Sequence, residues 1–445
     1  MGEWLNGITG WLTANPSWLS LAIFLVSFTE CLAIAGLIVP GTVALFAIAA
    51  LAGSGVMPLS ETLLLGFAGG LLGDALSYLA GRKFHQNIRR LPGLRHHPGW
   101  IAGAESYFQR YGIASLLVGR FVGPLRPMLP MVAGMLDMPV LRFAGVSVIA
   151  AAGWSVAYLL PGWAAGAAVR LPLPEGFWPQ AAVVGGGLAL LLAIAAQSSL
   201  RNKRLAPRVV AVASLVMLLA VFFGWPYLDH FDRGIMTLVQ EQRSGTTETL
   251  VIVVTGLGDF RTQFVVAAVL VLVLALARQW RHALFAGGAM LAAALLNNTM
   301  KHLFARVRPE VLSEPLTTFS MPSGHSSASF ALFMALAVLA GRGQSVRLRL
   351  TWLLLGGMPA LAIAMSRVYL GVHWPTDVLA GMLLAFFTCS ASLAVVQWRQ
   401  SLPALPVKVW WLVLPALAVV FGAFAVHGLP HALERYQYEL LQPER

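Results

Sequence analysis

The sequence predicts an all-α polytopic membrane protein, and three observations support this. The chain has 445 residues, of which 58% are hydrophobic and 11% charged, whereas soluble domains carry about a quarter charged residues. Apolar stretches able to cross a hydrocarbon core of roughly 30 Å recur along it. Several contain glycine and proline, which membrane helices tolerate well. The stretches include residues 177–197, 209–224, 263–277, 283–300, 328–341, 351–365, 378–396 and 409–426.

Charge and cysteine content exclude two other classes of protein. The formal net charge is +12, but lysine and arginine lie mainly in short loops between apolar stretches, so we interpret them as orientation charges and expect no nucleic-acid partner. The two cysteines, Cys31 and Cys389, both lie inside apolar stretches. We expect them to be packing residues, with no disulfide framework.

The first half is not a simple series of spans. Residues 20–53 are apolar but interrupted at "VPG", residues 39–41, and "RFVGPLRPMLPMVAG", residues 120–134, contains three prolines and two arginines. Non-helical backbone at membrane depth persists only where protein or a water-filled cavity satisfies its polar groups. We therefore expect re-entrant hairpins around both interruptions.

Three motifs of this half carry a family resemblance. They are "FTECLAIAGLIVPGT", "GGLLGDALSYLAGR" and "GRFVGPLRPMLPMVAG", and together they resemble the DedA family, the bacterial relatives of the VTT-domain scramblases, over residues 15–195. The resemblance implies a lipid-translocation domain. The glycines at positions 66, 70 and 73 are equally well explained by close helix packing through small residues.

Four charged residues stand in this apolar region: Glu30, Asp74, Arg120 and Arg126. Unpaired charges there cost several kcal/mol, so we expect facing hairpins to pair them across a polar cavity. Such a cavity would accept a lipid phosphate, and a carboxylate would couple proton movement to it. The family commonly has an acidic residue after Pro-Gly, where this chain has Thr42, which weakens the expectation of proton coupling.

A basic segment separates the halves. "QSSLRNKRLAPR", residues 197–208, carries four basic residues between two apolar spans, and we interpret it as a cytoplasmic linker because positive charge accumulates inside. Because successive spans cross the membrane in opposite directions, residues 305–325 and 366–375 are then expected on the outer face, together with the mixed-charge segment 228–261. The expected domains are residues 1–196, the linker 197–208, a second domain 209–400, and an extra transmembrane helix with its tail, 401–445.

The second half collects cations, histidines and a carboxylate at one membrane level. They lie in "KHLFARVRP", in "PSGH" and in "SRVYLGVHWPTD". Intramembrane ionisable groups are usually functional, and lysine and arginine with nearby backbone N–H groups suit a tetrahedral phosphate. A helix starting near His325 would point its positive end at the same anion.

The joint spacing K-x6-R-P, P-S-G-H and S-R-x5-H-x3-D resembles the type 2 phosphatidic acid phosphatase superfamily. The resemblance implies a six-helix bundle, here with one extra helix, and a metal-independent reaction without cofactor. It makes His373 the nucleophile that forms a phosphohistidine, Asp377 the group orienting it, and His325 the general acid and base. The residues implied to bind phosphate are Lys301, Arg308, Ser323, Gly324 and Arg367.

The two resemblances together predict a bacterial inner-membrane lipid phosphatase with its site facing the periplasm. Its substrate is then undecaprenyl pyrophosphate, and the first half translocates the lipid product. Because both halves belong to one chain, the effective concentration of the product at the translocation domain is raised. Phosphatidylglycerophosphate, phosphatidic acid and lipid A phosphates remain alternative substrates, with the first half as a general scramblase or a scaffold. Vanadium haloperoxidases share the second resemblance, but they are soluble. The sequence predicts no oligomeric state and no role for 409–445.

Overall fold

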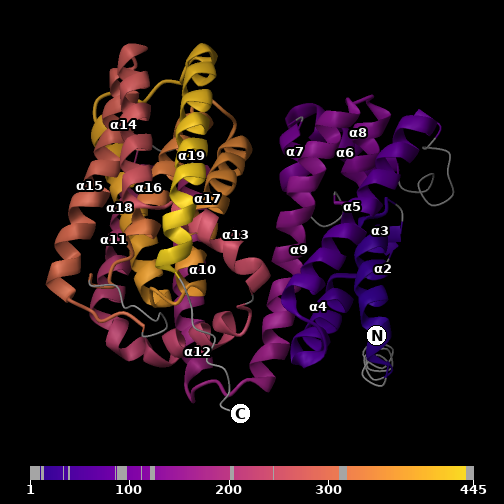
Figure 1. Ribbon diagram of the computed structural model, residues 1–445. Helices are drawn as coiled ribbons and strands as arrows, with labels where there is room; N and C mark the ends of the chain where they lie inside the picture. Colours follow the sequence, from indigo (N-terminus) through magenta and orange to yellow (C-terminus); the bar gives the residue numbers. More distant parts are fainter. Residues whose placement is uncertain are drawn as a thin grey trace. The chain divides into compact units, whose positions relative to one another are not determined.

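The computed structural model is helical throughout the residues it describes, which confirms the predicted class (Figure 1). The chain divides into two compact units, Met1–Pro172 and Leu173–Arg445. The structure describes residues 11, 15–33, 35–38, 41–85, 87, 98–111, 113–120, 126–200, 205–243, 245–309 and 318–436.

The first unit is built on the long helix α5. A 3₁₀ turn, Pro16–Trp18, precedes the helices, and a π-helical turn, Ala52–Val56, extends α4. Helices α2, α8 and α9 all pack on α5. The helices are α2 (Leu19–Cys31), α3 (Ala35–Ile38), α4 (Gly41–Leu51), α5 (Leu59–Phe84), α6 (Pro98–Tyr111), α7 (Ile113–Gly119), α8 (Met128–Met135) and α9 (Val140–Arg170).

Both interruptions predicted from prolines and glycines separate short helices that pack on a neighbour. Helix α2 contacts α4, and α7 contacts α8; in Figure 1 the chain runs up α2 to α3 and returns along α4. The apolar helices Leu19–Cys31 and Gly41–Val56 are each shorter than a full span, as a re-entrant hairpin requires. Residues 39–40 and 121–125, at the centres of the two interruptions, lie outside the described residues.

Small residues let α5 approach its neighbours closely. A Cβ on Gly73 would lie 2.6 Å from the carbonyl oxygen of Phe28, and one on Gly66 would overlap Leu159 Cδ1. Both glycines therefore serve helix packing. Gly70 differs, because its nearest neighbour is the Nη2 atom of Arg120, at 2.8 Å from a Cβ built there.

The second unit surrounds α18, which packs on α11, α15 and α16. A short 3₁₀ segment, Trp225–Leu228, joins α11 to the amphipathic α12. The helices are α10 (Phe177–Leu200), α11 (Ala206–Gly224), α12 (Asp229–Gln240), α13 (Gly245–Gly256), α14 (Phe260–Leu276), α15 (Trp280–Phe304), α16 (Gly324–Gly341), α17 (Val346–Tyr369), α18 (Pro375–Val396) and α19 (Val407–Arg435).

The division between the units comes earlier than the linker that the charge pattern indicates. Helix α10 packs on α11 and α12, so the apolar stretch 177–197, which we assigned to the first domain, lies in the second unit. Residues 201–204 of the expected linker lie outside the described part of the chain. Composition alone does not reveal that α10 packs on α11, the helix that follows it.

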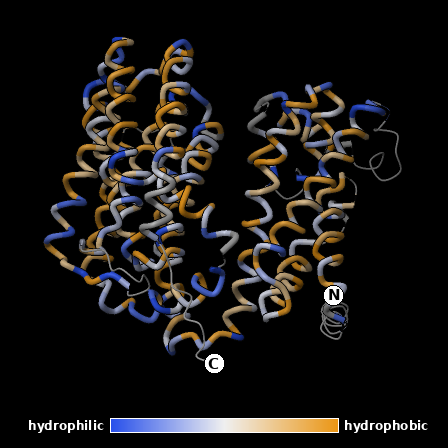
Figure 2. The backbone as a smooth tube through the Cα atoms, in the orientation of Figure 1, coloured by the Kyte–Doolittle hydropathy of each residue, from blue (hydrophilic) through white to orange (hydrophobic). Residues whose placement is uncertain are grey.

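Among the described residues, nine helices are long and apolar enough to cross a membrane, and α13 with α14 forms one further pair bent by 46°. Figure 2 shows hydrophobic residues along most of the length of these helices. Each apolar stretch named above overlaps a helix, and Leu59–Phe84 and Val140–Arg170 supply further candidate spans in the first unit. The chain is therefore a polytopic membrane protein.

Candidate active site

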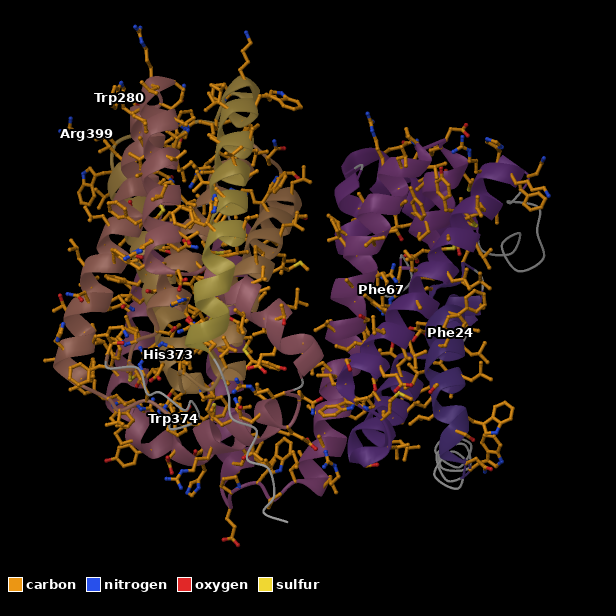
Figure 3. The ribbon with its side chains drawn as sticks, viewed as in Figure 1. Phe24, Phe67, Trp280, His373, Trp374 and Arg399 are labelled. Atoms are coloured by element: carbon orange, nitrogen blue, oxygen red, sulfur yellow. The ribbon has the colours of Figure 1, made fainter. Side chains whose placement is uncertain are left out.

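The residues of the three second-half motifs meet at one end of the second unit. Lys301 lies in the last turn of α15, Arg367 in the last turn of α17, and Ser323 is the N-cap of α16. His373 precedes α18, and Figure 3 shows it with Trp374 at the opposite end of the bundle from Trp280 and Arg399. Antiparallel packing of α15, α16, α17 and α18 thus joins residues 72 positions apart in one site.

The side chain of His373 is 2% exposed and lies between a cation and a carboxylate. Its Nε2 atom is 3.1 Å from Arg308 Nη1, and its Nδ1 atom is 3.5 Å from Asp377 Oδ2. Because a guanidinium only donates, Nε2 is the accepting nitrogen, and in the neutral ring Nδ1 then carries the proton. Nδ1 lies on the side of Asp377 but has no hydrogen-bond partner among the described residues. Burial lowers the pKa of His373 well below its usual value, and Arg308 and Arg367 lower it further. The imidazole is therefore neutral, with the lone pair of Nε2 directed at Arg308.

Two of the three cations, Arg308 and Lys301, bond to backbone carbonyl groups at this end of the unit, and the third, Arg367, bonds to a side chain. Arg308 donates from Nη1 to the carbonyl oxygen of Val372 at 2.6 Å and from Nε to that of Thr318 at 2.6 Å. Lys301 Nζ donates to the carbonyl oxygen of Phe319 at 2.6 Å. Arg367 is 2% exposed, and its Nη1 donates to Thr255 Oγ1 at 2.8 Å.

Ser323 and Gly324 fix the start of α16. The Ser323 hydroxyl accepts from the backbone N–H of Ser326 at 3.4 Å and is 2.9 Å from the Ser326 hydroxyl, which is ordinary N-cap geometry. The backbone N–H of Ser323 donates to the carbonyl oxygen of Asp377 at 2.9 Å. This bond ties the start of α16 to the first turn of α18.

His325, in the first turn of α16, has a carboxylate partner that the motifs do not contain. Its Nε2 lies 2.8 Å from Asp259 Oδ1, and Asp259 is the N-cap residue of α14. His325 is 17% exposed, against 2% for His373, so His325 is the histidine nearer to water. Asp259 lies in the segment 228–261 that topology placed on the same face, but no spacing linked it to His325.

Arg306 is a second residue that sequence reasoning missed. Its Nη2 donates to Asp232 Oδ2 at 2.7 Å, and its Nη1 donates to Asp377 Oδ1 at 2.8 Å. Both carboxylates are fully buried, and Asp232 also accepts from the backbone N–H of Thr376 at 2.8 Å. Because Asp377 Oδ2 accepts from the N–H of Trp374 at 2.9 Å, the carboxylate beside His373 is fixed through both oxygens.

The four charged residues of the first half form two buried ion pairs. Glu30 pairs with Arg126, and Asp74 pairs with Arg120. All four are at most 7% exposed. Charges from α2, α5 and the segment before α8 therefore meet, as expected of facing hairpins.

Neighbouring side chains add hydrogen bonds to these pairs. Tyr158 accepts from Arg126 Nη2 at 2.7 Å, and Ser147 donates to Asp74 Oδ2 at 2.8 Å. Thr42, in the position where an acidic residue is common, donates to Glu30 Oε1 at 3.1 Å. The other oxygen, Glu30 Oε2, is buried and has no hydrogen-bond partner within the described residues.

Both halves match known families. Residues 39–164 match the model of the VTT domain, and residues 282–401 match that of the PAP2 superfamily. The described site residues from Lys301 to Asp377 all lie inside the second match, whereas Asp232 and Asp259 precede it.

Relatives match over part of their length. The inner membrane protein YabI of Escherichia coli is 40% identical over 161 residues, 36% of this chain and 63% of YabI. An uncharacterized membrane protein of Buchnera aphidicola subsp. Schizaphis graminum is 33% identical over 172 residues, 39% of this chain and 67% of that protein. The crystal structure of a transmembrane PAP2-type phosphatidylglycerolphosphate phosphatase from Bacillus subtilis aligns with a TM-score of 0.39 and 22% identity, covering 43% of this chain and 97% of that one.

Proposed function

Because the chain belongs to the VTT-domain family in its first half and carries a PAP2 superfamily domain in its second, we propose that it hydrolyses a membrane lipid phosphate through a phosphohistidine. The observation that carries this proposal is the buried, neutral His373, whose accepting Nε2 lies 3.1 Å from Arg308 while Asp377 faces Nδ1. A nucleophile oriented by a carboxylate beside a phosphate-binding cation is the arrangement that this chemistry needs.

In the first step, Nε2 of His373 attacks phosphorus and the bond from phosphorus to the leaving oxygen breaks. His325 gives its proton to that oxygen, and Asp259 stabilises the protonated form of His325 beforehand. Lys301, Arg308 and Arg367 stabilise the charge on the equatorial phosphate oxygens; Lys301 and Arg308 also position the loops around the anion.

In the second step, water attacks the phosphohistidine and the bond between phosphorus and Nε2 breaks. His325, now neutral, removes the proton from the attacking water, and inorganic phosphate leaves. Asp377 keeps the proton of His373 on Nδ1 throughout, so that Nε2 recovers its lone pair. Each proton and each bond is accounted for by residues of this chain and one water molecule.

We further infer that the substrate is undecaprenyl pyrophosphate, hydrolysed at the periplasmic face of the inner membrane. Orientation by positive charge supports that face, because positive residues accumulate on the cytoplasmic side and the opposite end of the bundle carries Arg278, Arg281, Arg342, Arg349 and Arg399. The first half then moves the lipid monophosphate product, and its two buried arginines are the groups that would bind the phosphate. Because both halves belong to one chain, the product is released at a high effective concentration with respect to the translocation domain.

The test is phosphate release by the purified protein from a panel of lipid phosphates in detergent. The panel contains undecaprenyl pyrophosphate, phosphatidylglycerophosphate, phosphatidic acid and a lipid A phosphate. Release that disappears in His373→Ala, with the same apparent Tm as the wild type, supports the nucleophile. A preference for a glycerophospholipid would contradict the inferred substrate, and no release from any lipid would contradict the enzyme assignment.

A further inference from the structure

Helix α19 and the residue after it lie beyond the PAP2 match, which ends at residue 401. Tyr436 follows α19 directly and is 2% exposed. Its hydroxyl accepts from Arg367 Nη1 at 2.8 Å, and the Arg367 guanidinium carbon lies 5.3 Å from the centre of its ring. A residue near the end of the chain therefore contacts a cation of the candidate active site.

The guanidinium of Arg367 is hydrogen-bonded through Nη1, whereas its Nε donor has no partner among the described residues. Its Nη1 donates both to Tyr436 and to Thr255, whereas its buried Nε has no hydrogen-bond partner among the described residues. A buried guanidinium N–H without an acceptor is costly, and an oxygen of a bound oxyanion is the acceptor that would satisfy it. The two hydroxyls therefore fix the guanidinium while leaving Nε for the ligand.

Tyr436 also packs in the hydrophobic cluster that includes the residue before His373. It shares a buried cluster with Ile252, Leu370 and Val372. Val372 precedes His373, and its carbonyl oxygen accepts from Arg308. The same tyrosine thus contacts the residue that binds phosphate and the loop that carries the nucleophile.

Helix α19 supports the other histidine as well. It packs on α13 and α14, the bent pair whose junction carries Asp259. Thr255, the second acceptor of Arg367, lies on α13. Helix α19 therefore packs on α13, which carries the Thr255 acceptor of Arg367, and on the α13–α14 pair whose junction carries Asp259, the partner of His325.

We propose that Tyr436 is a positioning residue of the phosphate site and that α19 with Tyr436 belongs to the catalytic domain. The proposal rests on the proposed function, which it extends to a segment that the family match does not cover. Holding the guanidinium in place before an anion arrives reduces the ordering cost of binding. The predicted effect of losing Tyr436 is therefore on oxyanion affinity.

The experiment measures equilibrium binding of orthovanadate to the full-length protein in detergent, by calorimetry. Tyr436→Phe should weaken vanadate binding about fivefold, the equivalent of one hydrogen bond, with an unchanged apparent Tm. Tyr227→Phe is the matched control, because Tyr227 is 81% exposed and lies in the short segment between α11 and α12; its vanadate affinity should equal that of the wild type.

A second pair of variants separates positioning from general stability. In an Arg367→Lys background, which keeps the charge but not the guanidinium fork, Tyr436→Phe should cause no further loss of vanadate affinity. An equal loss in both backgrounds, or wild-type affinity in Tyr436→Phe, would overturn the proposal. Vanadate binding that depends on Tyr436 in a protein that releases no phosphate from lipids would support it while refuting the proposed function. A wild type that does not bind vanadate would overturn both.

Discussion

Arg306 and Arg308 stand two residues apart and should respond to the same substitution in opposite ways. Arg306→Gln removes the counter-charge of Asp232 and Asp377, which are both fully buried. Breaking a buried pair in this way costs about 3–5 kcal/mol, because the carboxylates are left without a cation. At roughly 2–4 °C per kcal/mol for a domain of this size, the apparent Tm should fall by about 6–20 °C.

Arg308→Gln should instead spare stability and reduce catalysis. Arg308 is only partly buried and bonds to loop carbonyls and to His373, so the folded protein loses little. Removing one group that stabilises charge in a transition state typically lowers kcat by about 10²–10³-fold. Thermal unfolding in detergent and phosphate release, measured on both variants, test the pair. An Arg306→Gln protein with the Tm of the wild type and the kcat of Arg308→Gln would refute the reasoning, since Arg306 would then act on the substrate.

Three further predictions concern single groups. Because the pKa of His373 is lowered well below 6.5, its neutral, nucleophilic form is lost only when the pH falls through that lowered pKa. Phosphoenzyme formation in single-turnover experiments should therefore not decline between about pH 7 and pH 6. A decline centred near the ordinary pKa of 6.5 would contradict this prediction. Asp259→Asn should lower kcat by about 10²-fold by weakening His325 as acid and base, and unchanged kcat would exclude a catalytic pairing. Arg126→Met should lower the apparent Tm because Glu30 is left buried without its cation, and adding Glu30→Gln should restore it; a double variant no more stable than the single one would argue against the ion pair.

Motif spacing and hydropathy predict much of this architecture, because both depend on local sequence. The apolar stretches become helices, and K-x6-R-P, P-S-G-H and S-R-x5-H-x3-D lie at helix ends that meet. The position of α10 is not local information. Its sequence is apolar on every side, and only its packing on α11 and α12 assigns it to the second unit.

The partners of the motif residues also escape prediction from sequence. Asp232 and Arg306 are 74 positions apart, and Asp259 and His325 are 66 apart. Arg306 lies in the loop after α15 and Asp259 just before α14, and no common motif links either residue to its partner. Tyr436 is a further case, since its tail has no apolar or charged pattern that relates it to Arg367. One feature of the sequence does help to find such partners. Acidic residues are scarce in this chain, at 18 of 445, so an aspartate on the same membrane face as the cluster of cations is a candidate partner.

The buried Asp232–Arg306–Asp377 network also has a consequence for biogenesis. Ribosomes deliver the chain from its N-terminus, so α12 emerges with Asp232 long before Arg306 and Asp377 exist. Until then that carboxylate has no counter-ion, and α12 is better placed in water or at the lipid headgroups than in hydrocarbon. Once α15 and α18 have been inserted, Arg306 closes the network. His373 thus acquires its fixed carboxylate only after α18 has been inserted, so a chain that has not yet reached α18 lacks the assembled cluster of Arg308, His373 and Asp377.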